Sequence, residues 1–169
     1  MITLRPYHND FTTAMYEAAR ESVETVSPWM PWLHDEYSLE VAAAWSERQQ
    51  QSFDEGSAYE FMILDATERY LGGIGVNQID LANPRGNLGY WVRASAQNRG
   101  VGTAATCLLV DWMFSNTPLV RLEVVVSVEN AASLRVAEKA GAVREGVLRS
   151  RLLLRGRLHD AVMFSFIRE

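Results

Sequence analysis

The architecture of this chain can be inferred from eight residues just past its middle, Gln97-Asn98-Arg99-Gly100-Val101-Gly102-Thr103-Ala104. They place a glycine-bearing turn between a strand-like run and a helix that begins immediately afterwards. Gly100 and Gly102 allow backbone conformations closed to other residues and let a ligand approach the main chain. Free amides in the helix's first turn, the helix dipole and the Thr103 hydroxyl then favour an anion. The stretch predicts a cradle for a pyrophosphate.

Residues that the turn lacks restrict the class of nucleotide to which this pyrophosphate can belong. A P-loop has Lys followed by Ser or Thr after its last glycine, whereas Thr103-Ala104 follows here. A dinucleotide fingerprint needs G-x-G-x-x-G early in a βαβ unit, and neither spacing nor position fits. The pattern Q-x-x-G-x-G instead resembles the acyl-CoA loop of the GCN5-related N-acetyltransferase (GNAT) superfamily. Taken alone, the motif is equally compatible with a turn and helix start that bind no ligand.

A second segment extends the resemblance. Residues 124–133 lead from a buried strand into a short helix that Asn130 is suited to cap and Gly141 to end. The run E-G-x-L-R follows at residues 145–149. This combination is similar to the ribosomal-protein N-terminal acetyltransferases of the RimJ/RimL type. The likeness covers nearly the whole chain, through residues 2–6, 29–33, 88–92 and 156–160.

Length and composition indicate one globular domain, residues 1–169. Apolar residues make up 48% of the chain and charged residues 22%, which is ordinary for globular proteins. No segment approaches the roughly 20 apolar residues of a membrane-spanning helix, and the start lacks the basic and apolar regions of a signal peptide. We therefore expect a cytoplasmic enzyme without a membrane partner. The resemblance implies either a monomer or a homodimer.

The charged residues and the single cysteine bear on possible partners. A net charge of −5 argues against a nucleic-acid partner. Acidic residues are concentrated in the first third of the chain and arginines near its end. This asymmetry would steer a cationic acceptor toward the acidic part, or it reflects only the solvated faces of two helices. Cys107 is expected to be a packed core thiol. Three scattered histidines and one cysteine make no metal constellation, so no metal is expected.

Hydrophobic patterning predicts an α+β chain that alternates strands and helices without linker or repeat. Strands are expected at residues 2–5, 61–64, 73–79, 88–93, 121–127, 142–149 and 158–167, the last two as an antiparallel pair. Helices are expected at about 10–24, 38–54, 102–115 and 131–140, the third burying positions 101, 105, 108, 109 and 112. The resemblance implies a mixed, mostly antiparallel sheet with helices on both faces and acyl-CoA between splayed fourth and fifth strands.

The resemblance also implies the chemistry. The enzyme must position a neutral amine against a thioester, stabilise an oxyanion and protonate the leaving thiolate. Val92 or its neighbour is expected to supply the oxyanion amide, Ser133 to act as general acid and Asn130 to contact pantetheine. Without a ligand, Ser133 would bond its own helix backbone and Asn130 would be a plain cap.

The predicted site residues fall into two groups. The acetyl-CoA site is expected to comprise Trp91, Val92, Gln97, Asn98, Arg99, Gly100, Val101, Gly102, Thr103, Asn130 and Ser133. The acceptor site is expected to comprise Trp29, Trp32, His34 and Tyr90, because amphipathic rings often wall a cleft. Trp45 and Trp112 are more simply helix packing, and adjacent His159 and Asp160 should face opposite sides of their strand.

The general base is the least determined element. Some relatives carry a glutamate after the E-G-x-L-R run, where this chain has Arg151-Leu152-Leu153. Glu123 is more simply a glutamate paired with Arg121 or solvent, and His34, although its intrinsic pKa suits a base, lies in a loop. A peptide α-amine, with a pKa of about 8, needs less help than a lysine near 10.4.

Three functions stay open. The first is acetylation of a protein or peptide α-amine, which the lower amine pKa favours. The second is acetylation of a small amine or antibiotic, since sites are grafted onto folds independently. The third is CoA binding without turnover.

Overall fold

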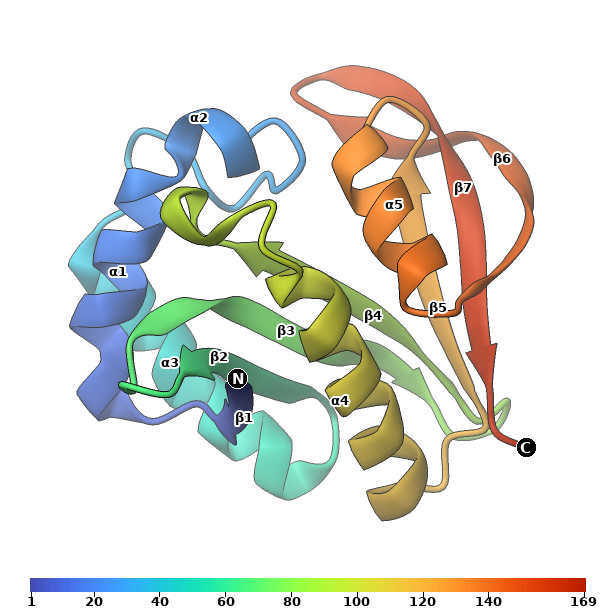
Figure 1. Ribbon diagram of the computed structural model, residues 1–169, viewed down its shortest axis with the longest axis horizontal. Coiled ribbons are helices and arrows are strands. Elements are labelled where there is room, and N and C mark those ends of the chain that lie inside the picture. The colour runs from blue at the N-terminus through green and yellow to red at the C-terminus, as the bar shows by residue number, and fades with distance from the viewer.

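One seven-stranded sheet runs through the computed structural model, which describes residues 1–169, in the order β1-β2-β3-β4-β5-β7-β6 (Figure 1). The strands are β1 Ile2–Pro6, β2 Tyr59–Asp65, β3 Tyr70–Asp80, β4 Arg85–Val92, β5 Arg121–Ser127, β6 Val143–Leu154 and β7 Arg157–Ile167. All neighbours are antiparallel except β4 and β5. The predicted α+β, mostly antiparallel sheet is confirmed, and β6 extends beyond its predicted end.

The helices are α1 Thr12–Glu21, α2 Val23–Val26, α3 Leu39–Glu55, α4 Val101–Asn116 and α5 Ala131–Lys139, with short 3₁₀ turns at Asn9–Phe11 and Ala94–Ala96. The first predicted helix, 10–24, is broken at Ser22, whose hydroxyl donates to the carbonyl of Ala18 at 2.6 Å. Such back-bonding competes with the helical ladder. No helix is both long and apolar enough to cross a membrane.

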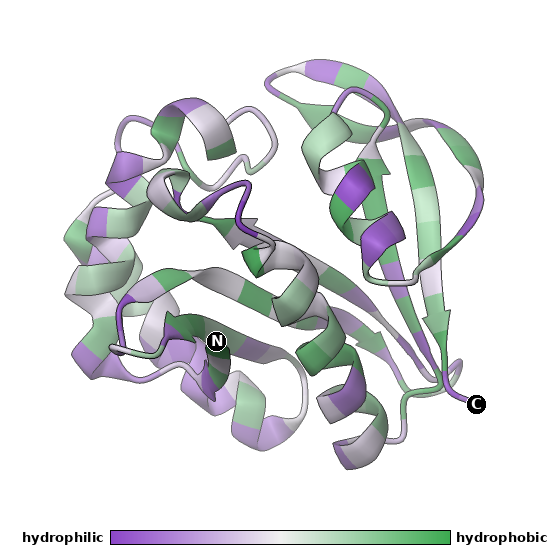
Figure 2. Ribbon diagram, in the orientation of Figure 1, coloured by the Kyte–Doolittle hydropathy of each residue, from purple (hydrophilic) through white to green (hydrophobic).

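Strand alternation divides the core into two clusters, one on each face of the sheet. Phe61 and Ile63 of β2 belong to the larger cluster, which α4 and α5 cover. Met62 and Leu64 belong to the smaller one, which α1 and α3 cover. Figure 2 shows hydrophobic residues along the strands and on α4 between these layers. Helices therefore cover both faces, as expected.

The pairing of β4 with β5 is short. It is limited to Arg85 with Arg121, Gly86 with Leu122 and Asn87 with Glu123. Beyond these pairs the two strands diverge, as Figure 1 shows. The predicted splay is confirmed, and the backbone groups of β4 that face β5 have no strand partner after Asn87.

Helix α4 corrects two expectations. Its buried face follows positions 101, 105, 109 and 113, a run at four-residue spacing, and the flanking Leu108 is 43% exposed. Cys107 is also exposed rather than a core thiol, and its Sγ lies 3.9 Å from the carbonyl oxygen of Ala140. The half-buried Trp112 packs against Phe61 with ring centroids 4.9 Å apart, as expected of helix packing.

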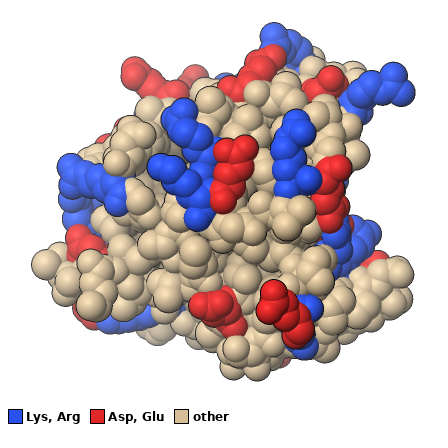
Figure 3. Space-filling view, turned by 45° about the vertical axis from the view of Figure 1, so that its right-hand side comes forward, with Lys and Arg blue, Asp and Glu red and all other residues tan.

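The predicted separation of charges is not visible over the face seen in Figure 3. Positive and negative side chains are interspersed there rather than gathered by sign. On this face the arrangement favours solvated surface charges over a steering field.

Candidate active site

A groove of about 330 Å³ lies between β4, the start of α4 and α5. Ten of the eleven residues predicted to bind the acyl-CoA line it: Trp91, Val92, Gln97, Asn98, Gly100, Val101, Gly102, Thr103, Asn130 and Ser133. Arg99 is exposed and does not line the groove. The sequence motifs therefore converge on one cavity.

The glycine turn has the geometry of an anion site. Gly100 caps α4 in the left-handed conformation, φ 77°, and its carbonyl accepts the first helical bond, from Ala104. The amides of Val101, Gly102 and Thr103 have no protein acceptor and point out of the helix start. Unlike Gly100, Gly102 is helical, which corrects the expectation of special backbone freedom. A Cβ built there would lie 3.4 Å from the methyl carbons of Val136, which is an ordinary contact distance.

Gln97 fixes the turn from inside. Its Nε2 donates to the carbonyl of Val92 at 2.9 Å and to the hydroxyl of Thr25 at 3.1 Å. The side chain thus ties the end of β4 to α2, and its role is to hold the turn's shape.

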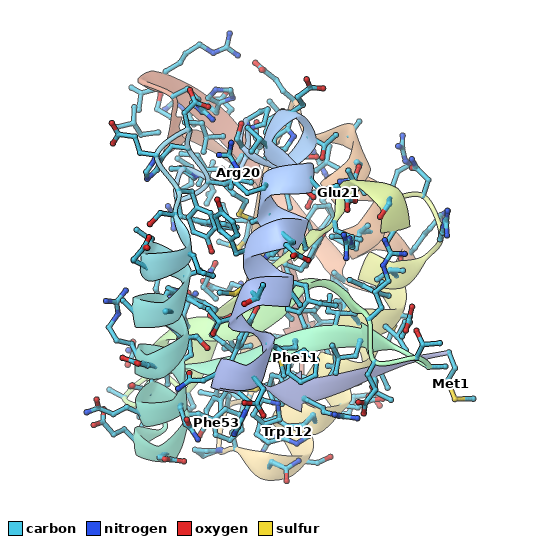
Figure 4. The ribbon with its side chains drawn as sticks, turned by 90° about the vertical axis from the view of Figure 1, so that its left-hand side faces the viewer. Met1, Phe11, Arg20, Glu21, Phe53 and Trp112 are labelled. Carbon is cyan, nitrogen blue, oxygen red and sulfur yellow. The ribbon has the colours of Figure 1, made fainter.

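An ion pair ties α1 to the residues that lead into the glycine turn. Glu21 accepts bonds from the Arg93 guanidinium and, at 2.8 Å, from the amide of Ser95, while Arg93 also donates to the carbonyl of Tyr70 at 2.9 Å. The bonds from Arg93 and then Ser95 lower the pKa of Glu21 to about 2. Figure 4 shows Glu21 on the side of α1 that faces this turn.

Tyr90 and Ser133 meet across the splayed strands. The Tyr90 hydroxyl lies 2.8 Å from Oγ of Ser133 and donates to the Ser133 carbonyl at 3.0 Å. Burial raises the pKa of Tyr90 to about 12. Asn130 caps α5 by accepting the Ser133 amide at 3.1 Å. The Ser133 hydroxyl is thus held by Tyr90 of β4 rather than by the backbone of its own helix, α5.

A second cavity, of about 680 Å³, lies on the other side of β4. Its lining includes all four predicted acceptor residues: Trp29, Trp32, His34 and Tyr90. The Trp91 ring, predicted at the acyl-CoA site, turns toward this cavity, with centroids 5.5 Å from Trp32 and 5.9 Å from Tyr70. Trp29, Met30, Tyr90 and Trp91 line both cavities, so the groove and the cleft share one wall.

Several lining residues escaped the sequence analysis. Arg135 and Lys139, one turn apart on α5, add positive charge to the groove. Glu60, Asn77 and Asn87 line the cleft. The signal for Glu60 was available, since it precedes Met62 and Leu64 by two and four positions and must share their face of the sheet.

Three other carboxylates, including the candidate base Glu123, are engaged elsewhere. Glu123 binds Arg121 at 2.8 Å and Arg85 at 3.1 Å, which confirms the pairing with Arg121, although its side chain is only 17% exposed. Glu145, of the E-G-x-L-R run, also pairs with Arg121. Asp160 accepts the Ser150 amide at 2.8 Å.

His159 lies on the opposite face of β7 from Asp160. Its Nδ1 is 3.1 Å from the Ser127 hydroxyl. The expected separation of the two side chains is confirmed.

The tryptophan-rich loop, residues 27–38, connects α2 to α3 and carries Trp29 and Trp32. It is held by the β6–β7 hairpin, which is distant in sequence. Arg155 donates from Nε to the carbonyl of Ser27 at 3.2 Å and from its terminal nitrogen to that of Leu33 at 3.5 Å. Figure 1 shows the hairpin tip reaching toward α2. A residue at the far end of the sequence thereby fixes one wall of the cleft.

A splayed sheet with an anion-binding helix start in its gap defines the N-acetyltransferase class of α+β folds. The chain belongs to the acetyltransferase (GNAT) domain family, whose model matches residues 1–143. It is 33% identical over 115 residues to an uncharacterized N-acetyltransferase, p20, of Bacillus licheniformis, a match spanning 68% of this chain and 65% of the relative. It is 31% identical to a putative ribosomal N-acetyltransferase, YdaF, of Bacillus subtilis (strain 168), over 57% of this chain and 53% of the relative.

Solved structures share the fold. The RimL ribosomal L7/L12 α-N-protein acetyltransferase in complex with coenzyme A matches with a TM-score of 0.91 at 21% identity, covering 98% of this chain and 93% of its own. Spermidine N-acetyltransferase from Vibrio cholerae in complex with CoA and spermine matches with a TM-score of 0.81 at 18% identity, covering 98% and 95%. The predicted family and fold are confirmed.

Proposed function

We propose that this protein is an acetyl-CoA-dependent N-acetyltransferase that transfers the acetyl group directly to a primary amine. The observation that carries the proposal is the wall formed by Tyr90 and Trp91, which separates a groove suited to an acyl-CoA from an aromatic cleft suited to an amine. A thioester lying along the groove can present its carbonyl at this wall. No covalent enzyme intermediate is needed, because the thioester is already activated.

The groove has the donors that a CoA pyrophosphate requires. The free amides of Val101, Gly102 and Thr103 and the positive end of the α4 dipole favour an anion. Arg135 and Lys139 add cationic side chains on the opposite side. These residues are assigned to phosphate binding, with Asn130 assigned to the pantetheine arm.

The chemical step follows from the unpaired part of β4. A backbone amide at Val92 or its neighbour stabilises the oxyanion as the amine nitrogen attacks the acetyl carbon. The carbon–sulfur bond then breaks, and the Ser133 hydroxyl donates its proton to the departing thiolate. Tyr90, bonded to Ser133, holds that hydroxyl in place, and solvent restores its proton.

The acceptor proposed first is the α-amine of a protein or peptide, as in the ribosomal-protein enzymes. YdaF and RimL, which this chain resembles, carry ribosomal names. The cleft's rings suit an extended peptide end, and an α-amine loses its proton more readily than a lysine. The second candidate is a small polyamine or antibiotic amine, which the size of the cleft favours, since small-molecule sites span about 300–1,000 Å³.

Free-thiol release from acetyl-CoA tests the proposal. Peptides beginning with Ala, Ser or Met are compared with small amines and antibiotics. Release with peptides alone supports α-amine acetylation, and release with small amines alone supports the second candidate. Tight CoA binding without release from any acceptor contradicts the proposal and favours a non-catalytic module. Ser133→Ala, which should bind CoA normally yet lose turnover, provides the matched comparison.

A further inference from the structure

A carboxylate lies within the floor of the acceptor cleft. Glu60 of β2 pairs with Gly75 of β3, which in turn pairs with Gly89 of β4. The three positions form one row across the sheet, on the face that carries Trp91. A Cβ at Gly75 would overlap Oε2 of Glu60, so the carboxylate leans over β3 toward β4.

The neighbouring glycine keeps the space beside this carboxylate open. Nothing lies within 4 Å of a Cβ built at Gly89. Strands are spaced about 4.8 Å apart, so the hollow above Gly89 lies between the Glu60 carboxylate and the splayed edge of β4, three residues before Val92. A water in that hollow would bridge the two, since it has Oε2 of Glu60 as one partner and the acceptor nitrogen as the other.

Two amide side chains next to this row form a chain of hydrogen bonds that ends at Glu60. Asn77 donates from Nδ2 to Oε1 of Glu60 at 3.3 Å, and Asn87 donates to Oδ1 of Asn77 at 3.2 Å. Oε2 of Glu60 has no protein donor. The bonded oxygen fixes the orientation of the carboxylate, and the other oxygen is directed to the hollow.

We propose that Glu60 is the proton acceptor of the reaction, taking the proton of the acceptor ammonium through a water above Gly75 and Gly89. The inference rests on the proposed function and identifies its base. The ammonium proton passes to the water and the water's proton to Glu60. The neutral nitrogen then forms the new carbon–nitrogen bond and releases its remaining excess proton to solvent water as the carbon–sulfur bond breaks. Ser133 protonates the thiolate, after which solvent reprotonates Ser133 and takes the proton from Glu60.

The protonation behaviour of Glu60 suits this role. Burial raises its pKa to about 7, partly opposed by the bond from Asn77, and a base is most effective with a pKa near the working pH. The groups that share its surroundings come from β3, α3, β6 and two loops: Tyr7, His34, Tyr37, Arg48, Tyr70 and Arg151. Tyr7 and Tyr70 bond each other at 2.6 Å, and burial raises the pKa of both, so they stay neutral beside it.

The test compares Glu60→Gln with wild type and with Glu17→Gln, an exposed glutamate outside both cavities. We expect kcat for Glu60→Gln to fall by about 10²-fold or more, as for loss of a general base, with the Kd for CoA unchanged. The wild-type rise of kcat with pH near 7 should disappear in Glu60→Gln. Glu60→Asp should recover part of the rate together with that rise.

Three results would overturn the assignment. If Glu60→Gln keeps the wild-type kcat and pH profile, Glu60 is not the base although the acetyltransferase function stands. If the variant changes only KM for the acceptor, Glu60 binds the amine without accepting its proton. If the wild-type protein itself releases no thiol with any acceptor, the proposed function fails and this assignment fails with it.

Discussion

The hydroxyl oxygen of Tyr90 lies 2.8 Å from Oγ of Ser133, and this contact joins β4 to α5 across the splayed pair of strands. Tyr90→Phe removes the contact but keeps the ring. We expect kcat to fall roughly tenfold because Ser133 loses its orientation, and stability to fall by about 1 kcal/mol for one lost hydrogen bond. Steady-state kinetics and thermal unfolding measure both. Unchanged kcat would show that the contact only joins the two elements.

Gly100 and Gly141 form a matched pair for the glycine turn. Both are left-handed, with φ 77° and 90°, and a Cβ at either would meet open space. Substitution by alanine should destabilise each by a similar amount, about 1–2 kcal/mol for a left-handed residue. Only Gly100→Ala should weaken CoA binding, by about tenfold, a shift of 1.4 kcal/mol in binding free energy. Calorimetric titration of both variants with CoA decides this, and equal affinities would remove the turn from the binding site.

The Glu21 to Arg93 ion pair predicts an acid-dependent loss of stability. Because the folded pKa of Glu21, about 2, is below its ordinary value of 4.5, ionised Glu21 stabilises the fold above pH 4.5, and this contribution is lost as the pH falls toward 2. Glu21→Gln should be less stable than wild type at pH 7, and the difference should shrink below pH 4.5. Urea denaturation across this pH range measures it. A difference independent of pH would contradict the assignment.

The Arg155 contacts with the tryptophan-rich loop predict a selective effect on the acceptor. Arg155→Ala removes the bonds to the carbonyls of Ser27 and Leu33. KM for the acceptor should rise several-fold while the Kd for CoA stays unchanged, since the loop forms a wall of the cleft. Arg149→Ala, an exposed arginine of the same hairpin, is the control. Equal effects of the two substitutions would indicate general electrostatics instead.

Much of the fold could be predicted because local signals agree with it. The helix from Leu39 to Glu55 has Ser38 at its N-cap and Gly56 at its left-handed end, and such caps are legible in sequence. The break of the first helix at Ser22 could not be predicted, because the Ser22 hydroxyl also accepts a hydrogen bond from the amide of Ala94, far along the chain. Likewise, helical spacing places Leu108 beside the buried Leu109, yet Leu108 is 43% exposed.

The parts of the candidate site that lie in contiguous sequence motifs could be predicted. The parts that come together only when strands pair in the sheet were missed. The groove's lining follows from the residues around Gly100 and Asn130. The face of the sheet on which Glu60 lies follows from Met62 and Leu64, but its position beside Gly75 and Gly89 does not, because register is a property of pairing rather than of one strand. Arg155 reaches across more than a hundred residues to its partners, and no local pattern marks it.

The wall shared by the two cavities has a kinetic consequence. Since Tyr90 and Trp91 separate the groove from the cleft, neither substrate has to leave before the other enters. Both can be bound at once, so the reaction should proceed through a ternary complex. Double-reciprocal plots at varied concentrations of both substrates should intersect rather than run parallel, and CoA and the acetylated product should depart by separate exits.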